Sequence, residues 1–233
     1  MNGLIFDMDG TMVDNMMVHH RAWQRLLKSL GLDYSLERVK EEIHGVNMEI
    51  LQRLFGDRFT PAERQQLADR KEAEYRDIFK EELEPVPGLI AFLDRAKALE
   101  IPMAIATAAP PENAEFVLEY MDSRRSQPAA NGTPFADYFG HIVHSDMVSK
   151  GKPNPEVIEQ AAAGIGIPLS ECLFFEDSVT GAQTGQNGGC PVVVITTTHK
   201  PAEFAGIDAI ISFQPDFSQL WIDDDRQLVV KSN

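Results

Sequence analysis

The feature that most constrains the fold of this chain is a pair of aspartates directly after an apolar run. Residues 4–6 are apolar, Asp7 and Asp9 follow, and Gly10 allows a sharp turn. Such a run is typical of a strand buried on both faces of a parallel sheet. Side chains two residues apart on extended backbone point to the same side, so both carboxylates can face one site. Buried carboxylates are costly without a cation, which favours a hard divalent ion such as Mg²⁺.

Charge and composition exclude several classes of protein. The chain has 233 residues and a formal net charge of −15, which disfavours nucleic acid and anionic membranes as partners. No run of about 18 apolar residues is present, so no membrane span is expected. The early aspartates argue against a secretory signal, and the two cysteines make neither a disulfide framework nor a zinc site. We therefore expect a cytoplasmic protein. Separately from this argument, a monomer or a weak dimer is expected.

Residues 15–84 have helical patterns and no strand pattern. Apolar residues recur at helical spacing in residues 18–30, and Gly31 follows as a stop signal. Thr60 and Pro61 are typical of a helix N-cap and a first helical position. We expect four helices, over residues 18–30, 35–44, 47–55 and 61–80.

From residue 89 onward, helical and strand patterns alternate along the chain. Apolar strands are expected at residues 103–107, 142–144, 172–175, 192–195 and 209–211. Helices are expected at residues 89–99, 112–121, 155–164 and 181–187. This alternation predicts an α/β fold with a doubly wound parallel sheet. Residues 123–134 are polar and contain Pro and Gly, so we expect an exposed loop there.

The two patterns together predict a core domain with an all-helical insertion. Residues 1–14 and 85–233 form the α/β core, and residues 15–84 form the inserted domain. The insertion leaves the core directly after the paired aspartates, so we expect it to act as a lid on the site.

Further polar residues follow the strands of the expected sheet. Parallel sheets bind ligands outside the carboxyl ends of their strands. These positions hold one threonine, two neighbouring lysines and two acids: Thr107, Lys150, Lys152, Glu176 and Asp177. Structural alternatives exist, because the threonine or the acids can cap the next helix and the lysines can be solvated loop charges.

Taken together, these residues resemble the four motifs of the haloacid dehalogenase superfamily of phosphotransferases. The motifs are D-x-D-x-T after the first strand, a Ser/Thr after the second, a Lys before a Pro-containing helix start, and an acidic pair after the fourth. The matching residues, in order, are Asp7, Asp9 and Thr11, then Thr107, then Lys152, then Glu176 and Asp177. The segment around His19 and the pair Gly45 and Val46 are similar to the β-phosphoglucomutase and small sugar-phosphatase branch.

The resemblance implies a Rossmann-like core, a helical cap and a mechanism through an aspartyl-phosphate. Asp7 would be the nucleophile and Asp9 the general acid and base. Mg²⁺ would be held by Asp7, by the backbone carbonyl of Asp9, and by Asp177 with Glu176. Those four residues are the expected metal site.

The resemblance also implies how substrate is bound. Thr107 and Lys152 would hold the phosphoryl oxygens, and backbone amides, including that of Ala108, would complete the cradle. In the cap, we expect substrate contacts from His19, His44 and Asn47. The interpretation of His19 has an alternative, because a lone helix histidine is often a surface residue.

Departures from the family pattern decide between two activities. β-Phosphoglucomutases carry a Lys and an Arg in the cap loop, where this chain has His44 and Met48. The second phosphate site therefore looks incomplete, and we expect a phosphatase of small phosphorylated metabolites, such as sugar or polyol phosphates. The alternative is a β-phosphoglucomutase. Less favoured are a dehalogenase, a phosphonoacetaldehyde hydrolase, for which Lys40 is poorly placed, and a catalytically silent binding protein.

Overall fold

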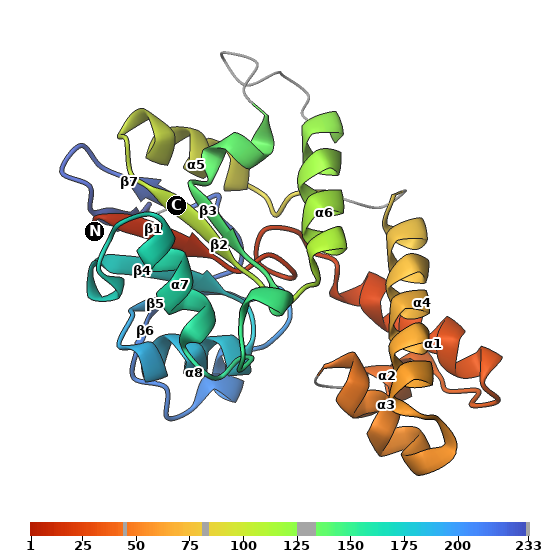
Figure 1. Cartoon of the computed structure of the whole chain (residues 1–233). Coiled ribbons are helices and arrows are strands. Elements are labelled where there is room, and N and C mark those ends of the chain that lie inside the picture. Colours follow the sequence, from red (N-terminus) through yellow and green to blue (C-terminus); the bar gives the residue numbers. More distant parts are fainter. Residues whose placement is uncertain (44–45, 81–83, 125–133, 232–233) are drawn as a thin grey trace. The chain divides into compact units, whose positions relative to one another are not determined.

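The computed structural model describes residues 1–43, 46–80, 84–124 and 134–231. The chain divides into two compact units, one made of Met1–Asp14 with Glu84–Asn233 and the other of Asn15–Leu83 (Figure 1). No helix in the described part of the chain is both long and apolar enough to cross a lipid bilayer.

A six-stranded parallel sheet forms the centre of the larger unit. Its strand order is β3-β2-β1-β4-β5-β6, and every neighbouring pair is parallel. The strands are β1 (Gly3–Phe6), β2 (Met103–Ala106), β3 (His141–Val143), β4 (Cys172–Glu176), β5 (Val192–Ile195) and β6 (Ile210–Gln214). The expected doubly wound α/β fold is thereby confirmed, and the first and fourth strands lie side by side at its centre.

Side chains that alternate along β1 and β4 cover the two faces of this sheet. Phe6 stacks on Phe175 at 4.9 Å between ring centroids, and both contact Phe92 of α5 (Leu89–Ala98). Ile5 and Phe174 belong instead to the core beneath α7 (Glu156–Gly164) and α8 (Val179–Gly188). Because both faces of the sheet are buried, β1 and the first four residues of β4 are apolar, which is why their sequences form continuous runs.

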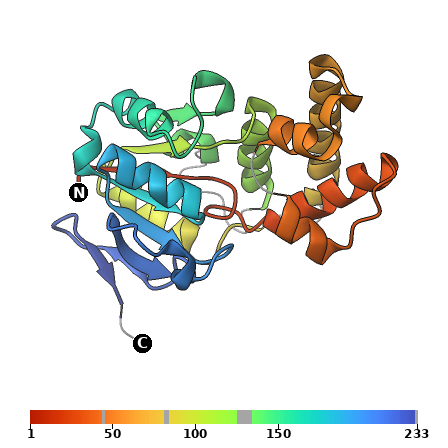
Figure 2. The same cartoon turned by 90° about the horizontal axis from the view of Figure 1, so that it is seen from below.

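The end of the chain contains a hairpin that the sequence patterns did not indicate. Strands β7 (Leu220–Ile222) and β8 (Leu228–Val230) pair antiparallel. The hairpin packs on α5, where Arg95 Nε donates to the Ile222 carbonyl at 2.8 Å. Figure 2 shows the hairpin in blue near the labelled C-terminus. Three-residue strands are too short to produce a clear alternation, so the tertiary contact with α5 determines them.

The remaining helix of the larger unit extends further than expected. Helix α6 spans Pro111–Arg124, whereas the sequence predicted an end at residue 121 and a loop from residue 123. The loop prediction therefore fails at its first two residues. Residues 125–133 of that predicted loop lie outside the described residues.

The smaller unit contains four α-helices in its described part, close to the expected bounds. They are α1 (Met16–Ser29), α2 (Leu36–Glu42), α3 (Asn47–Phe55) and α4 (Pro61–Phe79). Thr60 and Glu63 form a reciprocal capping box at the start of α4, which satisfies two backbone donors that the helix leaves free. Apolar side chains such as Trp23, Leu27 and Leu51 form a core of their own.

Candidate active site

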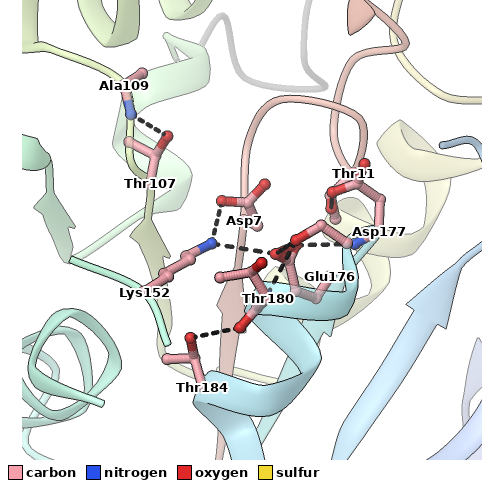
Figure 3. A network of polar contacts seen from close by, with 11 residues as sticks. Asp7, Thr11, Thr107, Ala109, Lys152, Glu176, Asp177, Thr180 and Thr184 are labelled. Atoms are coloured by element: carbon pink, nitrogen blue, oxygen red, sulfur yellow. Dashed lines mark hydrogen bonds and ion pairs between the residues drawn. The ribbon is translucent and has the colours of Figure 1, made fainter. Parts of the chain in front are cut away.

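Polar side chains converge where β1 and β4 end (Figure 3). Asp7 directly follows β1, Glu176 is the last residue of β4, and Asp177 comes next. Their backbones are joined, because the Asp7 amide donates to the Phe175 carbonyl at 2.9 Å. The strand order places β1 and β4 on either side of the point where the chain connections reverse, which is the ligand-binding position of such sheets.

The turn after Asp7 depends on a glycine. Gly10 has a φ of +81°, a conformation that few other residues adopt without strain. A Cβ atom at this position would lie 2.1 Å from Asp177 Oδ2. Gly10 therefore allows the turn and also leaves space for the Asp177 carboxylate beside it.

Three buried carboxyl groups form a cluster that can hold a cation. Ligand oxygens of Asp7, Glu176 and Asp177 all lie within 4.8 Å of one another. The three residues are 6%, 1% and 3% exposed, respectively. Asp9 is half-buried and is not a member of this side-chain cluster. Carboxylate oxygens at this spacing fit a hard divalent ion such as Mg²⁺.

Lys152 supplies a positive charge to this cluster. Its Nζ lies 2.6 Å from Asp7 Oδ1 and 3.4 Å from Glu176 Oε1, and its side chain is 9% exposed. The lysine lies 145 residues from Asp7 in the chain and enters from the segment before α7. The structure thus brings Lys152 together with Asp7, Glu176 and Asp177. Asp9 lies outside this side-chain cluster, and Thr107 lies at the end of the neighbouring strand β2.

Local contacts fix the orientation of the acidic pair. Glu176 Oε1 accepts from Ser178 Oγ at 2.7 Å, and Oε2 accepts from the Asp177 amide at 2.8 Å. A Cβ atom at Gly181 would lie 1.4 Å from Glu176 Oε1, so only glycine fits there. Ser178 caps α8, since its side chain accepts from the Gly181 amide. The alternative that the two acids serve as this cap is therefore wrong.

Burial and mutual repulsion make this cluster electrostatically unbalanced. Burial, with a further contribution from Glu176, raises the pKa of Asp7 to about 8 despite the nearby Lys152. Burial also raises the pKa of Asp177, and Glu176 and Asp7 add to the effect. Burial lowers the pKa of Lys152, but Asp7 and Glu176 more than offset this and the net direction is upward. Lys152 thus stays charged, and its single charge leaves the carboxyl groups in need of further positive charge.

Thr107 lies at the end of β2 in the same row of strand ends. It is 1% exposed, its amide donates to the Val143 carbonyl, and its Oγ1 accepts from the Ala109 amide at 3.0 Å. Ala108 between them is exposed. Helix α6 begins only at Pro111, so the alternative that Thr107 is its N-cap is wrong.

Two of the expected cap residues lie in one polar network within the helical unit. His19 Nδ1 is 2.8 Å from Lys71 Nζ, and the His19 ring stacks on Tyr75 with centroids 4.0 Å apart. Asn47 Nδ2 donates to Glu72 Oε1 at 2.6 Å. The third expected residue, His44, lies outside the described residues.

Sequence reasoning missed Lys71 and Glu72, which join these two residues. Lys71 Nζ lies 2.9 Å from Glu72 Oε1, and the two side chains are 3% and 10% exposed. Burial raises the pKa of Glu72, but Lys71 and His19 outweigh it and the net shift is downward. The two residues stand in a charged stretch of α4, and such a stretch usually indicates a solvated helix face. Only their burial distinguishes them.

Comparison with known proteins identifies the family to which this chain is similar. The family model of haloacid dehalogenase-like hydrolases matches residues 1–189. The chain is 28% identical to fructose-1-phosphate phosphatase YqaB of Escherichia coli, over 82% of this chain and 94% of that protein. It is 26% identical to the β-phosphoglucomutase of Bacillus subtilis, over 81% of this chain and 80% of that protein.

Solved structures support the same fold. The crystal structure of a β-phosphoglucomutase from Clostridium difficile matches with a TM-score of 0.75 and 22% identity. The match covers 95% of this chain and 93% of that one. The resemblance inferred from the sequence motifs, including its β-phosphoglucomutase-like and sugar-phosphatase branch, is confirmed by these matches.

Proposed function

Because the chain belongs to the haloacid dehalogenase-like hydrolases, we propose that it is a Mg²⁺-dependent phosphatase of small sugar or polyol phosphates. Relatives with that kind of activity support the substrate class, among them a fructose-1-phosphate phosphatase and a hexitol phosphatase. The observation that carries the proposal is the buried cluster of Asp7, Glu176 and Asp177 with Lys152 at the carboxyl ends of β1 and β4.

Asp7 is the proposed nucleophile. One of its carboxylate oxygens attacks phosphorus, a new P–O bond forms, and the bond to the substrate oxygen breaks. The product of this step is an aspartyl-phosphate and an alcohol. The burial of Asp7 and its contact with Lys152 support this role, because they hold the carboxylate in one orientation.

Asp9 is the proposed general acid and base. It gives a proton to the leaving oxygen in the first step and takes one from water in the second. The water oxygen then attacks phosphorus and releases Asp7 and inorganic phosphate. Asp9 is half-buried, which leaves it more accessible than Asp7, and its charge is close enough to Asp7 to raise the pKa of that carboxyl.

Asp7, Asp177, Glu176 and the Asp9 carbonyl are the proposed residues that hold Mg²⁺. When bound, the ion neutralises the carboxylates and so allows an anion to approach a phosphate group. Lys152 and the Thr107 hydroxyl would hold phosphoryl oxygens, with the Ala108 amide beside them.

The unit of residues 15–84 is the proposed cap domain, and its residues would determine which leaving groups the enzyme accepts. His19, His44 and Asn47 are its proposed substrate contacts, and the network around Lys71 and Glu72 supports a fixed arrangement of His19 and Asn47. The cytoplasm is the proposed location, since both cysteines are free and buried. We further propose a monomer or weak dimer.

The test of this function is phosphate release from a panel of sugar and polyol monophosphates. Purified protein should release phosphate with Mg²⁺ and lose this activity with excess EDTA, and added Mg²⁺ should restore it. A protein that binds these phosphates but releases none under any condition would be the silent binding protein instead.

A second candidate is a β-phosphoglucomutase, which the relative in Bacillus subtilis favours. A mutase must bind a phosphate at both ends of its substrate. This chain has Met48, the second residue of α3, where that family has Arg. Loss of such a partner removes charge-assisted hydrogen bonds of roughly 1.5–3 kcal/mol each. Incubation with β-glucose 1-phosphate and glucose 1,6-bisphosphate separates the two functions. A phosphatase releases phosphate, whereas a mutase forms glucose 6-phosphate and releases little.

A further inference from the structure

Three consecutive threonines follow β5 at the same edge of the sheet as the carboxylate cluster. Thr196 Oγ1 donates to the Gln214 carbonyl at 3.3 Å, at the end of the neighbouring strand β6. Thr197 Oγ1 donates to the Gly10 carbonyl. The segment after β5 is therefore fastened to the turn that carries the paired aspartates, although 187 residues separate the two in the chain.

The third threonine lies beside the acidic cluster. A Cβ atom at Gly10 would be 2.1 Å from Asp177 Oδ2 and 2.9 Å from Thr198 Oγ1. Because both distances are measured from the same point, Asp177 Oδ2 and Thr198 Oγ1 lie no further apart than the sum of the two. The space left by the missing Gly10 side chain is therefore bordered by both the Asp177 carboxylate and the Thr198 hydroxyl.

The Thr198 hydroxyl is buried and lacks a properly formed hydrogen bond within the described residues. It is nevertheless close enough to Asp177 to oppose part of the rise that burial and the neighbouring carboxyl groups cause in the pKa of Asp177. A buried polar group without a partner costs free energy, so such a group indicates an interaction made in another state of the protein. At the other oxygen of this carboxylate, Thr11 Oγ1 lies 3.5 Å from Asp177 Oδ1.

From this arrangement we infer that Thr198 is a positioning residue for the cation site. Its hydroxyl orients the Asp177 carboxylate when a divalent cation binds, and it is not itself a ligand. The inference rests on the proposed function, since it gives Asp177 the role of a metal ligand. Groups that hold a ligand from behind fix its orientation, and their removal typically lowers metal affinity or activity about 10–100-fold.

The matched variants are Thr198→Val, Thr198→Ser and Thr196→Val. The Val substitution at position 198 keeps the shape and removes the hydroxyl, whereas Ser keeps the hydroxyl. Thr196→Val is the control, because it removes a hydroxyl that donates to the Gln214 carbonyl of β6. Mg²⁺ affinity of the full chain is measured by titration calorimetry, and melting temperature is measured with and without Mg²⁺.

We expect Thr198→Val to bind Mg²⁺ about 10–100-fold more weakly, with Thr198→Ser and Thr196→Val near the parent. The metal-free melting temperature of Thr198→Val should stay unchanged or rise, because the hydroxyl lacks a good partner there, while its increase with Mg²⁺ should shrink. A purely structural role would instead lower the metal-free melting temperature and leave Mg²⁺ affinity unchanged.

Asp177→Asn separates failure of this inference from failure of the proposed function. If Asp177→Asn loses Mg²⁺ binding and Thr198→Val does not, the role of Thr198 is overturned and the function stands. If Asp177→Asn binds Mg²⁺ as the parent does, both are overturned. Failure of Thr198→Val to fold while Thr198→Ser folds would also overturn the inference, since the hydroxyl would then be needed without the cation.

Discussion

Two buried charged groups, one in each unit, differ in how their charges balance. In the larger unit, the described residues bring three carboxyl groups together with Lys152, and the pKa values of Asp7 and Asp177 rise. In the helical unit, Lys71 is matched by Glu72, and the pKa of Glu72 falls. The first group needs a further cation and is suited to chemistry, whereas the second is satisfied by its own residues and is suited to holding a shape.

The strongest test of the unbalanced group is Asp7→Asn. The amide cannot act as the nucleophile and is a poor ligand, so phosphate release should fall by several orders of magnitude. Steady-state phosphate release measures this, with Asp33→Asn, an exposed position, as the control. Circular dichroism of the variant should match that of the parent. Turnover near the parent rate would refute the role of Asp7.

Asp9→Asn separates acid-base chemistry from metal binding. We expect phosphate release to fall by about 10²–10⁴-fold, with Mg²⁺ affinity preserved, because the backbone carbonyl of Asp9 is the proposed ligand. Asp177→Asn should instead lose Mg²⁺ affinity. Titration calorimetry on both variants makes the comparison, and an equal loss of affinity would show that the two roles are wrongly assigned.

Lys71→Met tests the balanced group. Removal of one partner leaves the buried Glu72 carboxylate uncompensated, which costs about 3–5 kcal/mol of stability. Urea unfolding measures the loss, and Lys40→Met, at an exposed position of α2, is the control. The double variant Lys71→Met with Glu72→Gln should recover part of the loss. A single variant as stable as the parent would mean that the pair contributes little.

The last effect expected is a dependence of stability on pH. Asp7 has a folded pKa of about 8, above the ordinary value of 3.8, so the folded protein retains a proton that the unfolded chain releases. Its contribution to stability is therefore complete below the unfolded value and is lost as pH rises towards about 8. Without metal, the melting temperature should decline as pH rises over this range. The increase in melting temperature that Mg²⁺ causes should become larger over the same range.

Melting curves at pH 5 to 8, with and without Mg²⁺, check this expectation. Asp7→Asn should have a flatter pH profile, because it lacks the titrating group. A Mg²⁺ effect that does not change across the range would contradict the assignment of Asp7 as a buried carboxyl at the cation site.

Much of the structure could be predicted from local sequence. The helix Asn47–Phe55 has the predicted bounds, and α4 begins at Pro61 as Thr60 indicated. The strands before Asp7 and Asp177 were also predicted, because continuous apolar runs identify strands with two buried faces. The hairpin β7–β8 was not, since its short strands depend on packing against α5.

The sequence by itself determined where each catalytic candidate stands along the chain, because strand ends, caps and turns depend on neighbours within a few residues. The tertiary structure decided how the charges add up. It brought Lys152 to Asp7, buried Lys71 and Glu72 in a helix whose charges indicated a solvated face, and carried Thr198 to Gly10. Burial and charge balance are sums over residues far apart in the chain, so no local pattern contains them.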